Sequence, residues 1–281
     1  MAGSELPTIF YGLASAASWG AGDFSGGLAT RRSSVYDVVI VSQIVGAGCL
    51  VGVAFLLAEP FPAAIDLLYG GMAGISGAIG LVALYRGLAL GRMGVVAPVA
   101  ALVTAVIPVI AGIFIEGWPG GQQLLGFVTA LVAVWFISRA GDEARIQMRS
   151  LGLPVVAGLG FGLFFILIDR VSDGAVIWPL VAARVASISL MSLVVFVAQR
   201  GETPAMRQLP VVALAGIFDA GGNGFFALAA QFGRLDISAV LASLYPASTI
   251  LLAWLVLKEG LIPRQWAGVI AALVAVILIS S

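Results

Sequence analysis

The chain has 281 residues, of which 61% are hydrophobic and 10% are charged, and its mean hydropathy is +1.11. Soluble domains are about a quarter charged, so this composition excludes a soluble fold. The net charge is zero, there is no His and there is one Cys. We therefore expect no nucleic-acid partner, no metal site, no cofactor and no intrachain disulfide.

Apolar runs fill almost the whole chain, and each is long enough to cross a bilayer, which takes about 20 residues. The predicted membrane-spanning helices are 9–29, 35–57, 67–90, 94–115, 121–138, 151–169, 176–198, 209–231, 236–257 and 263–280. The fold class is therefore an all-α integral membrane protein with ten transmembrane helices. Because the chain is rich in Ala, Gly and Arg, we expect a bacterial inner (plasma) membrane.

The chain matches itself at one constant offset of 142 residues. Gly91-Arg92 falls on Gly233-Arg234, Trp19-Gly20 falls on Phe161-Gly162, and 123–138 falls on 265–280 with nine of sixteen positions identical. This predicts a first five-helix repeat over 1–138, a linker over 139–150 and a second five-helix repeat over 151–281. Five is odd, so the second repeat enters the membrane from the opposite side, as in alternating-access transporters.

Loop charge predicts the orientation. The loops after the odd-numbered spans carry 10 of the 14 Lys and Arg residues, whereas the other face carries only Arg170 and Arg234. By the positive-inside rule the first set of loops is cytoplasmic, which makes 139–150 a cytoplasmic linker and places both termini outside.

The whole chain resembles the EamA family of the drug/metabolite transporter superfamily. The resemblance rests on Trp19-Gly20, on Pro98 and Pro108 followed by Glu116, and on the stretch from Leu244-Tyr245-Pro246 to Glu259. It implies ten helices in two inverted repeats and the movement of small metabolites, amino acids among them. Many relatives place both termini in the cytoplasm and have a basic loop after the second span. Residues 58–66 contain no Lys or Arg, so we follow the charge count instead.

Four ionisable residues fall well inside predicted spans: Asp23, Arg86, Arg184 and Asp219. Charges inside a membrane are costly, at about 2.5–3.5 kcal/mol each on insertion scales, and commonly mark function. Asp23 or Asp219 could bind a proton or a substrate ammonium group, and Arg86 or Arg184 a substrate carboxylate. The alternative is that two acids and two bases form buried ion pairs that fix helix register.

Further candidates for the substrate site are Trp19, Tyr85, Asn223 and Tyr245. The three aromatic residues fall deep in spans, where they could line a cavity or could simply pack. Asn223 could bind substrate or bond to a neighbouring helix.

Internal prolines interrupt two spans that the repeat makes equivalent. Pro98 and Pro108 lie in the fourth span and Pro246 lies in the ninth. Proline removes a backbone hydrogen bond and kinks a helix. We expect this pair of kinked spans to act as a gate, or else to be a static feature of packing. Glu116 and Glu259, just beyond the same spans, are candidate helix-end anchors or solvated loop residues.

The function expected from these features is secondary transport of small polar metabolites. The leading candidate is export of an amino acid or related metabolite by alternating access, with protons as the candidate coupling ion. Its partners are then the substrate and membrane lipid, and no oligomer is predicted. Two alternatives stay open: a passive channel, and an intramembrane aspartyl protease that uses Asp23, in Gly20-Ala21-Gly22-Asp23, together with Asp219. Otherwise we expect no enzyme.

Overall fold

The described part of the chain is helical throughout. The structure, a computed structural model, describes residues 6–89, 93–138, 152–198, 208–258, 260 and 262–280. The helices are α1 (Leu6–Thr30), α2 (Val35–Leu56), α3 (Ala64–Ala89), α4 (Met93–Glu116), α5 (Gly121–Ser138), α6 (Gly152–Asp169), α7 (Ile177–Ala198), α8 (Leu209–Phe232), α9 (Leu235–Ala242), α10 (Tyr245–Leu257) and α11 (Pro263–Ser280). The predicted linker 139–150 lies outside the described residues.

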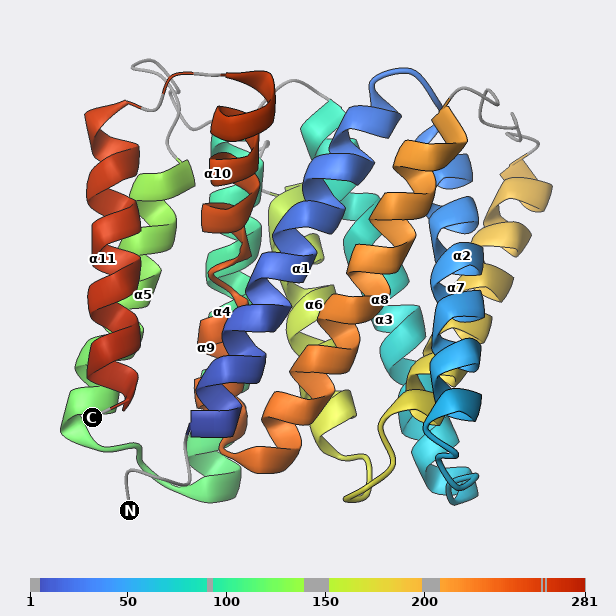
Figure 1. Ribbon diagram of the computed structural model, residues 1–281, viewed down its shortest axis with the longest axis horizontal. Coiled ribbons are helices and arrows are strands. Elements are labelled where there is room, and N and C mark those ends of the chain that lie inside the picture. Colours follow the sequence, from blue (N-terminus) through green and yellow to red (C-terminus); the bar gives the residue numbers. More distant parts are fainter. Residues whose placement is uncertain are drawn as a thin grey trace.

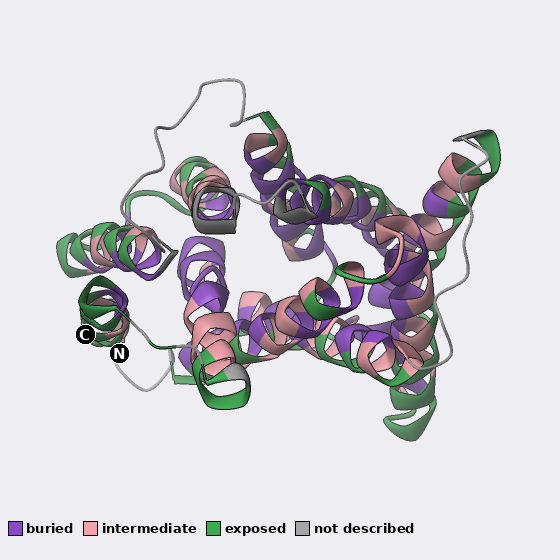
Figure 2. Cartoon of the chain, turned by 90° about the horizontal axis from the view of Figure 1, so that it is seen from above, coloured by how far each residue is buried: buried purple, intermediate pink, exposed green. Residues whose placement is uncertain are grey.

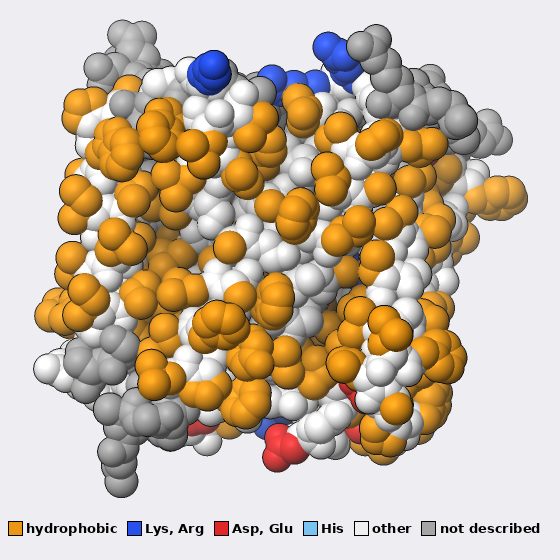
Figure 3. Space-filling view, viewed as in Figure 1, with side chains coloured by type: hydrophobic (Ala, Val, Ile, Leu, Met, Phe, Trp, Pro, Cys, Tyr) orange, Lys and Arg blue, Asp and Glu red, His pale blue; other side chains and the backbone are white. Residues whose placement is uncertain are grey.

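The helices have the length and polarity of membrane spans. Seven segments are long and apolar enough to cross a bilayer, within α2, α3, α4, α6, α7, α8 and the combined α9–α10, and α5 and α11 are shorter apolar helices. The remaining helix, α1, runs beside α8 through the same layer (Figure 1). Hydrophobic side chains cover the face seen in Figure 3, with most of the visible Lys and Arg near the upper rim and Asp and Glu near the lower one. The chain is a multi-pass membrane protein.

The ninth predicted span is two helices rather than one. α9 ends at Ala242, and α10 starts at Tyr245 with Pro246 in its first turn. Pro246 has no backbone N–H and its ring collides with the carbonyl four residues earlier, so the helix cannot continue through it. All eight residues of α9 are buried. Irregular backbone at membrane depth is tolerated where protein surrounds it.

The fourth span behaves differently from the ninth. α4 is one helix from Met93 to Glu116 and passes through Pro98 and Pro108 without interruption. The prediction that internal prolines interrupt both spans is therefore wrong for α4. A single proline costs a helix one bond, and packing of the surrounding bundle can keep the helix together.

Contacts between helices follow the predicted repeat. α1 packs along α8 and against α9 and α10, and the equivalent α6 packs along α3 and against α4. α2 pairs with its equivalent α7, and α5 pairs with its equivalent α11. The α5–α11 pair stands at one end of the bundle and α2 and α7 lie towards the other (Figures 1 and 2). The two inverted five-helix repeats thus interlock, and the centre of the molecule lies between them.

Close approach of α3 to α7 depends on glycine. A Cβ at Gly70 would overlap the backbone of Pro179, and one at Gly74 would overlap the backbone of Ala183. Gly71 also lies beside α7, but its Cβ would be 4.0 Å from Ala186 Cβ, which is an ordinary contact. These residues form one small-residue face at which the first repeat meets the second.

We expect Gly74→Ala to destabilise the protein by roughly 1–3 kcal/mol, because α3 must move away from α7 to admit the methyl group. Gly71→Ala is the matched control, and it should be neutral or stabilising because Ala favours helix by up to about 1 kcal/mol over Gly. Thermal unfolding of both variants in detergent measures the difference. Equal melting temperatures would show that α3 and α7 do not need this close approach.

Candidate functional site

A cavity lies between the two repeats. It encloses about 80 Å³ of free space, several times the ~10–15 Å³ that one water molecule needs. Both repeats contribute to its wall, from α1, α2, α3, α4, α6, α7, α8 and α10. The lining residues are Trp19, Asp23, Gln43, Gly74, Gly77, Ala78, Leu81, Thr104, Phe161, Phe164, Phe165, Ala183, Arg184, Ser187, Asp219, Asn223 and Tyr245. The wall is mostly apolar with a few polar groups, which is typical of a small-molecule site.

One side of the cavity holds a buried ion pair. Arg184 Nη1, on α7, lies 2.5 Å from Asp219 Oδ2, on α8, and the same nitrogen donates to Gln43 Oε1, on α2. Gln43 Nε2 donates to the same carboxylate oxygen at 3.2 Å, and Ser187 Oγ donates to Gln43 Oε1 at 3.0 Å. Three helices are therefore joined by one polar network, and Gln43 is the residue through which the first repeat takes part in it.

The guanidinium group of Arg184 makes only part of the hydrogen bonds that it could donate. Its Nε and Nη2 have no hydrogen-bond partner among the described residues, and the side chain is 5% exposed. Buried donors without a partner are costly. A change in the packing of these helices, or a ligand oxygen, could satisfy them.

The second acid in the cavity has no cation beside it. Asp23, on α1, is half-buried and makes no ion pair or hydrogen bond with another described residue. It lines the cavity together with Asp219 and Tyr245. Because Asp219 is already bound to Arg184, an ionised Asp23 is the uncompensated charge of the site.

Aromatic rings form another part of the cavity wall. The indole ring of Trp19 stacks on Phe165 at 5.4 Å between centroids, and Trp19 Nε1 donates to Asn223 Oδ1 at 3.0 Å. The hydroxyl group of Tyr245 is buried and has no partner among the described residues. This wall combines ring faces, which attract cations, with neutral polar groups that could orient a ligand.

The structure brings together six of the eight predicted substrate-binding residues: Trp19, Asp23, Arg184, Asp219, Asn223 and Tyr245 all line the cavity. Tyr85 and Arg86 do not line it. Tyr85 is buried, and a Cβ at Gly26 would meet its hydroxyl group.

Arg86 is placed differently from the other three ionisable residues of the predicted spans. Arg86 lies in the last turn of α3 and is exposed, with its guanidinium carbon 5.1 Å from the centre of the Tyr36 ring. A long Arg side chain near a helix end can extend its charged group to the membrane surface, which avoids the cost of burial. Of the four ionisable residues singled out in the sequence, three line the cavity.

Two prolines of the predicted gate, Pro108 and Pro246, are not among the lining residues of the cavity. Pro108 and Pro246 are buried in α4 and α10, and the side chain of Pro98 lies outside the described residues. Only Pro246 stands at a break between two helices.

Ser187, Thr104 and the phenylalanine residues of α6 line the cavity but were not predicted as site residues. Ser187 lies three residues after Arg184, so helical spacing places both on one face, and that signal could have identified it. Phe161, Phe164 and Phe165 are indistinguishable in sequence from packing residues.

Comparison with known proteins gives a family and a fold. The sequence profile of the EamA-like transporter family matches residues 6–139 and 149–281. A crystal structure of another protein superposes with a TM-score of 0.76 at 12% sequence identity, covering 94% of this chain and 97% of that one. At this identity the likeness shows the fold alone. No curated protein matches the chain.

Proposed function

The chain belongs to the EamA-like transporter family, and we propose that it is a secondary transporter of small polar metabolites that works by alternating access. One observation carries the proposal: the cavity lies between two interlocked inverted repeats, and each repeat contributes ionisable side chains to its wall. In such folds the substrate site lies near the membrane midplane at the interface of the repeats.

The substrate we propose is an amino acid or a related metabolite with an amino group, and the direction is export. Asp23 supplies an uncompensated carboxylate for a substrate ammonium group, and Trp19 and Tyr245 offer ring faces beside it. A proton could occupy the same carboxylate, which makes protons the candidate coupling ion. Arg184 is the one basic residue among the described lining residues and so the candidate partner for a substrate carboxylate.

Movement between the two access states is assigned to the broken ninth span. The turn between α9 and α10 can change its backbone angles at small cost, since Pro246 already removes helical bonds there. α4, which carries Pro98 and Pro108, is the equivalent element of the first repeat. Loop charge supports an orientation with both termini outside a bacterial inner membrane.

The contact between Asp219 and Arg184 counts against the protease alternative. Aspartyl catalysis requires two carboxylates that share a proton. Asp219 Oδ2 instead lies 2.5 Å from Arg184 Nη1, so this carboxylate oxygen already has a partner. A passive channel stays the competing function, and transport kinetics separate it from a carrier.

A thermal-stability screen of the purified protein against amino acids, amines and other metabolites tests the binding step. A ligand that binds the folded state should raise the melting temperature, by an amount that corresponds to about 2.7 kcal/mol at a concentration of 100 Kd. Asp23→Asn should abolish the shift. A ligand that stabilises both proteins equally would not bind at Asp23, and the proposed site would then be wrong.

A further inference from the structure

The terminal side is our name for the face of the protein at which α1 begins and α11 ends (Figure 1). Three acidic residues of the first repeat lie there, Glu59, Asp66 and Glu116, and each accepts hydrogen bonds from backbone N–H groups of the second repeat. We call these three residues and their partners the terminal latch.

Glu59 binds the start of α7. Its Oε1 accepts from the backbone N–H groups of Val176, Ile177 and Trp178 at 3.2, 2.8 and 3.1 Å, and its Oε2 accepts from Ile177 at 3.0 Å. Trp178 Nε1 returns a hydrogen bond to the carbonyl oxygen of Glu59 at 3.1 Å. The first N–H groups of a helix have no partner inside it, and a carboxylate also interacts favourably with the helix dipole. An acid from one repeat thus caps a helix of the other.

Asp66 makes the second contact. It lies in the first turn of α3, is 2% exposed, and accepts from the backbone N–H of Ser172 at 2.9 Å. Ser172 lies in the segment between α6 and α7, so Asp66 and Glu59 hold neighbouring parts of the second repeat.

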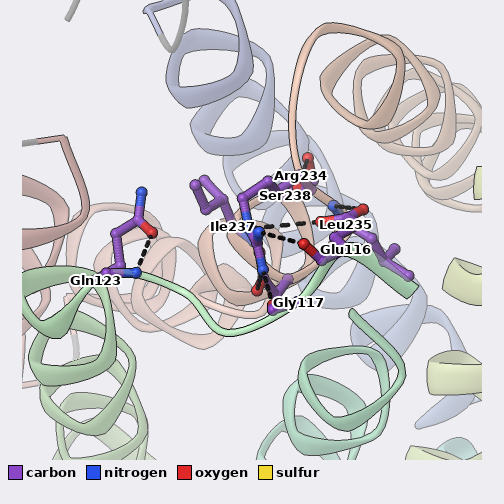
Figure 4. A network of polar contacts seen from close by, with 9 residues as sticks. Glu116, Gly117, Gln123, Arg234, Leu235, Ile237 and Ser238 are labelled. Carbon is purple, nitrogen blue, oxygen red and sulfur yellow. Dashed lines mark hydrogen bonds and ion pairs between the residues drawn. The ribbon is translucent and has the colours of Figure 1, made fainter. Parts of the chain in front are cut away.

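Glu116 makes the third contact, where α4 ends and α9 begins (Figure 4). Its Oε1 accepts from Leu235 N at 3.0 Å, and its Oε2 lies 3.5 Å from Arg234 Nε. Arg234 Nη2 also donates to the carbonyl oxygen of Gly117 at 2.8 Å and to Asp236 Oδ2 at 2.7 Å. Asp236 is fully buried. The latch therefore joins the end of α4 to the start of the broken span.

On the opposite face Arg31 and Arg32 are exposed, and Ser33 Oγ donates to Gln208 Oε1 across the repeats. The hydrogen bonds from the second repeat to Glu59, Asp66 and Glu116, by contrast, all lie on the terminal side.

We infer that the terminal latch is the closed gate of the terminal side, and that the structure represents the state closed on that side. This rests on the alternating access proposed above. Opening on the terminal side requires the second repeat to release Glu59, Asp66 and Glu116 together, because all three hold the starts of its helices or the segments just before them. Arg234, one of the two basic residues that sequence places on this face, acts as the cation of the gate rather than as part of the substrate site.

Cysteine accessibility tests the latch without any substrate. Cys49→Ala removes the only Cys of the chain, and Thr104→Cys then places one thiol in the cavity wall. A membrane-impermeant thiol reagent is applied to vesicles from either side in turn. We expect labelling from the basic-loop side and little from the terminal side. Adding Glu59→Gln and Glu116→Gln should raise the rate from the terminal side roughly tenfold or more, because the open state gains population.

Asp173→Asn is the matched control, since Asp173 is an exposed acid in the segment between α6 and α7 and makes no bond to the first repeat among the described residues. It should leave labelling unchanged. If the double variant does not fold, the two single variants each keep two of the three contacts and should show smaller increases. Unchanged terminal-side labelling in the folded Glu variants, or full terminal-side labelling of the parent, would overturn the latch. If the protein bound and transported no metabolite, the proposed function would be contradicted. The labelling rates would still test the latch, because they need no substrate.

Discussion

Replacement of Arg184 by Leu should lower the free energy of unfolding by roughly 2–4 kcal/mol. Removal of one partner from a buried ion pair typically costs about 3–5 kcal/mol, because the other charge is left without compensation. We take a lower value because the Asp219 side chain is 27% exposed to the cavity, whereas that of Arg184 is 5% exposed. Gln43 also loses the guanidinium group to which its side-chain oxygen binds. Thermal or denaturant unfolding in one detergent measures the loss.

The paired variant provides the control. Arg184→Leu combined with Asp219→Leu removes both charges, and replacing a buried ion pair with apolar side chains is often neutral or stabilising. We expect the double variant to recover most of the stability that the single variant loses. Similar stabilities for Arg184→Leu and the parent would show that the pair at 2.5 Å does not hold α7 to α8.

Asp23→Asn should reduce substrate uptake at least about thirtyfold, because removing one partner of a buried charge pair costs 2 kcal/mol or more. The same variant should fold as well as the parent. Asp23 makes no ion pair or hydrogen bond to the rest of the described chain, so the amide breaks no contact there. Uptake into proteoliposomes, with melting temperature measured alongside, separates the two effects.

Asp219→Asn is the matched comparison for this prediction. It should lose stability, since it leaves Arg184 buried without its carboxylate partner. A selective loss of uptake in the Asp23 variant and a loss of stability in the Asp219 variant would assign one acid to substrate and the other to structure. Normal uptake by Asp23→Asn would remove Asp23 from the site.

The spans could be predicted from sequence because each depends on local hydropathy and length. The repeat could be predicted because Gly91-Arg92 and Gly233-Arg234 share one offset with the matched stretches 123–138 and 265–280. Family membership is confirmed over both halves of the chain. Internal proline residues have different effects in the two equivalent spans: a helix break lies beside Pro246, whereas α4 continues through Pro108. The packing of the surrounding helices, and not the proline alone, decides whether a helix continues.

The site was harder to predict because its contacts are distant in sequence. Arg184 pairs with Asp219, which is 35 residues away, and with Gln43, which is 141 residues away, so no local pattern marks them as partners. Arg86 has the same composition signal as Arg184, yet it lies at a helix end and is exposed. The role of Glu59 was missed because an acid between two spans looks like a solvated loop residue until the start of α7 is placed beside it.

The central claim is that one cavity between the repeats is exposed to the two sides of the membrane in turn. Exchange of labelled substrate in proteoliposomes tests this claim most directly. The substrate used is whichever compound raises the melting temperature in an Asp23-dependent manner. A carrier with this single site predicts uptake that saturates with external substrate, that is accelerated by unlabelled substrate inside the vesicles, and that Asp23→Asn abolishes. Flux that rises linearly with concentration, is indifferent to internal substrate and persists in Asp23→Asn would contradict the account.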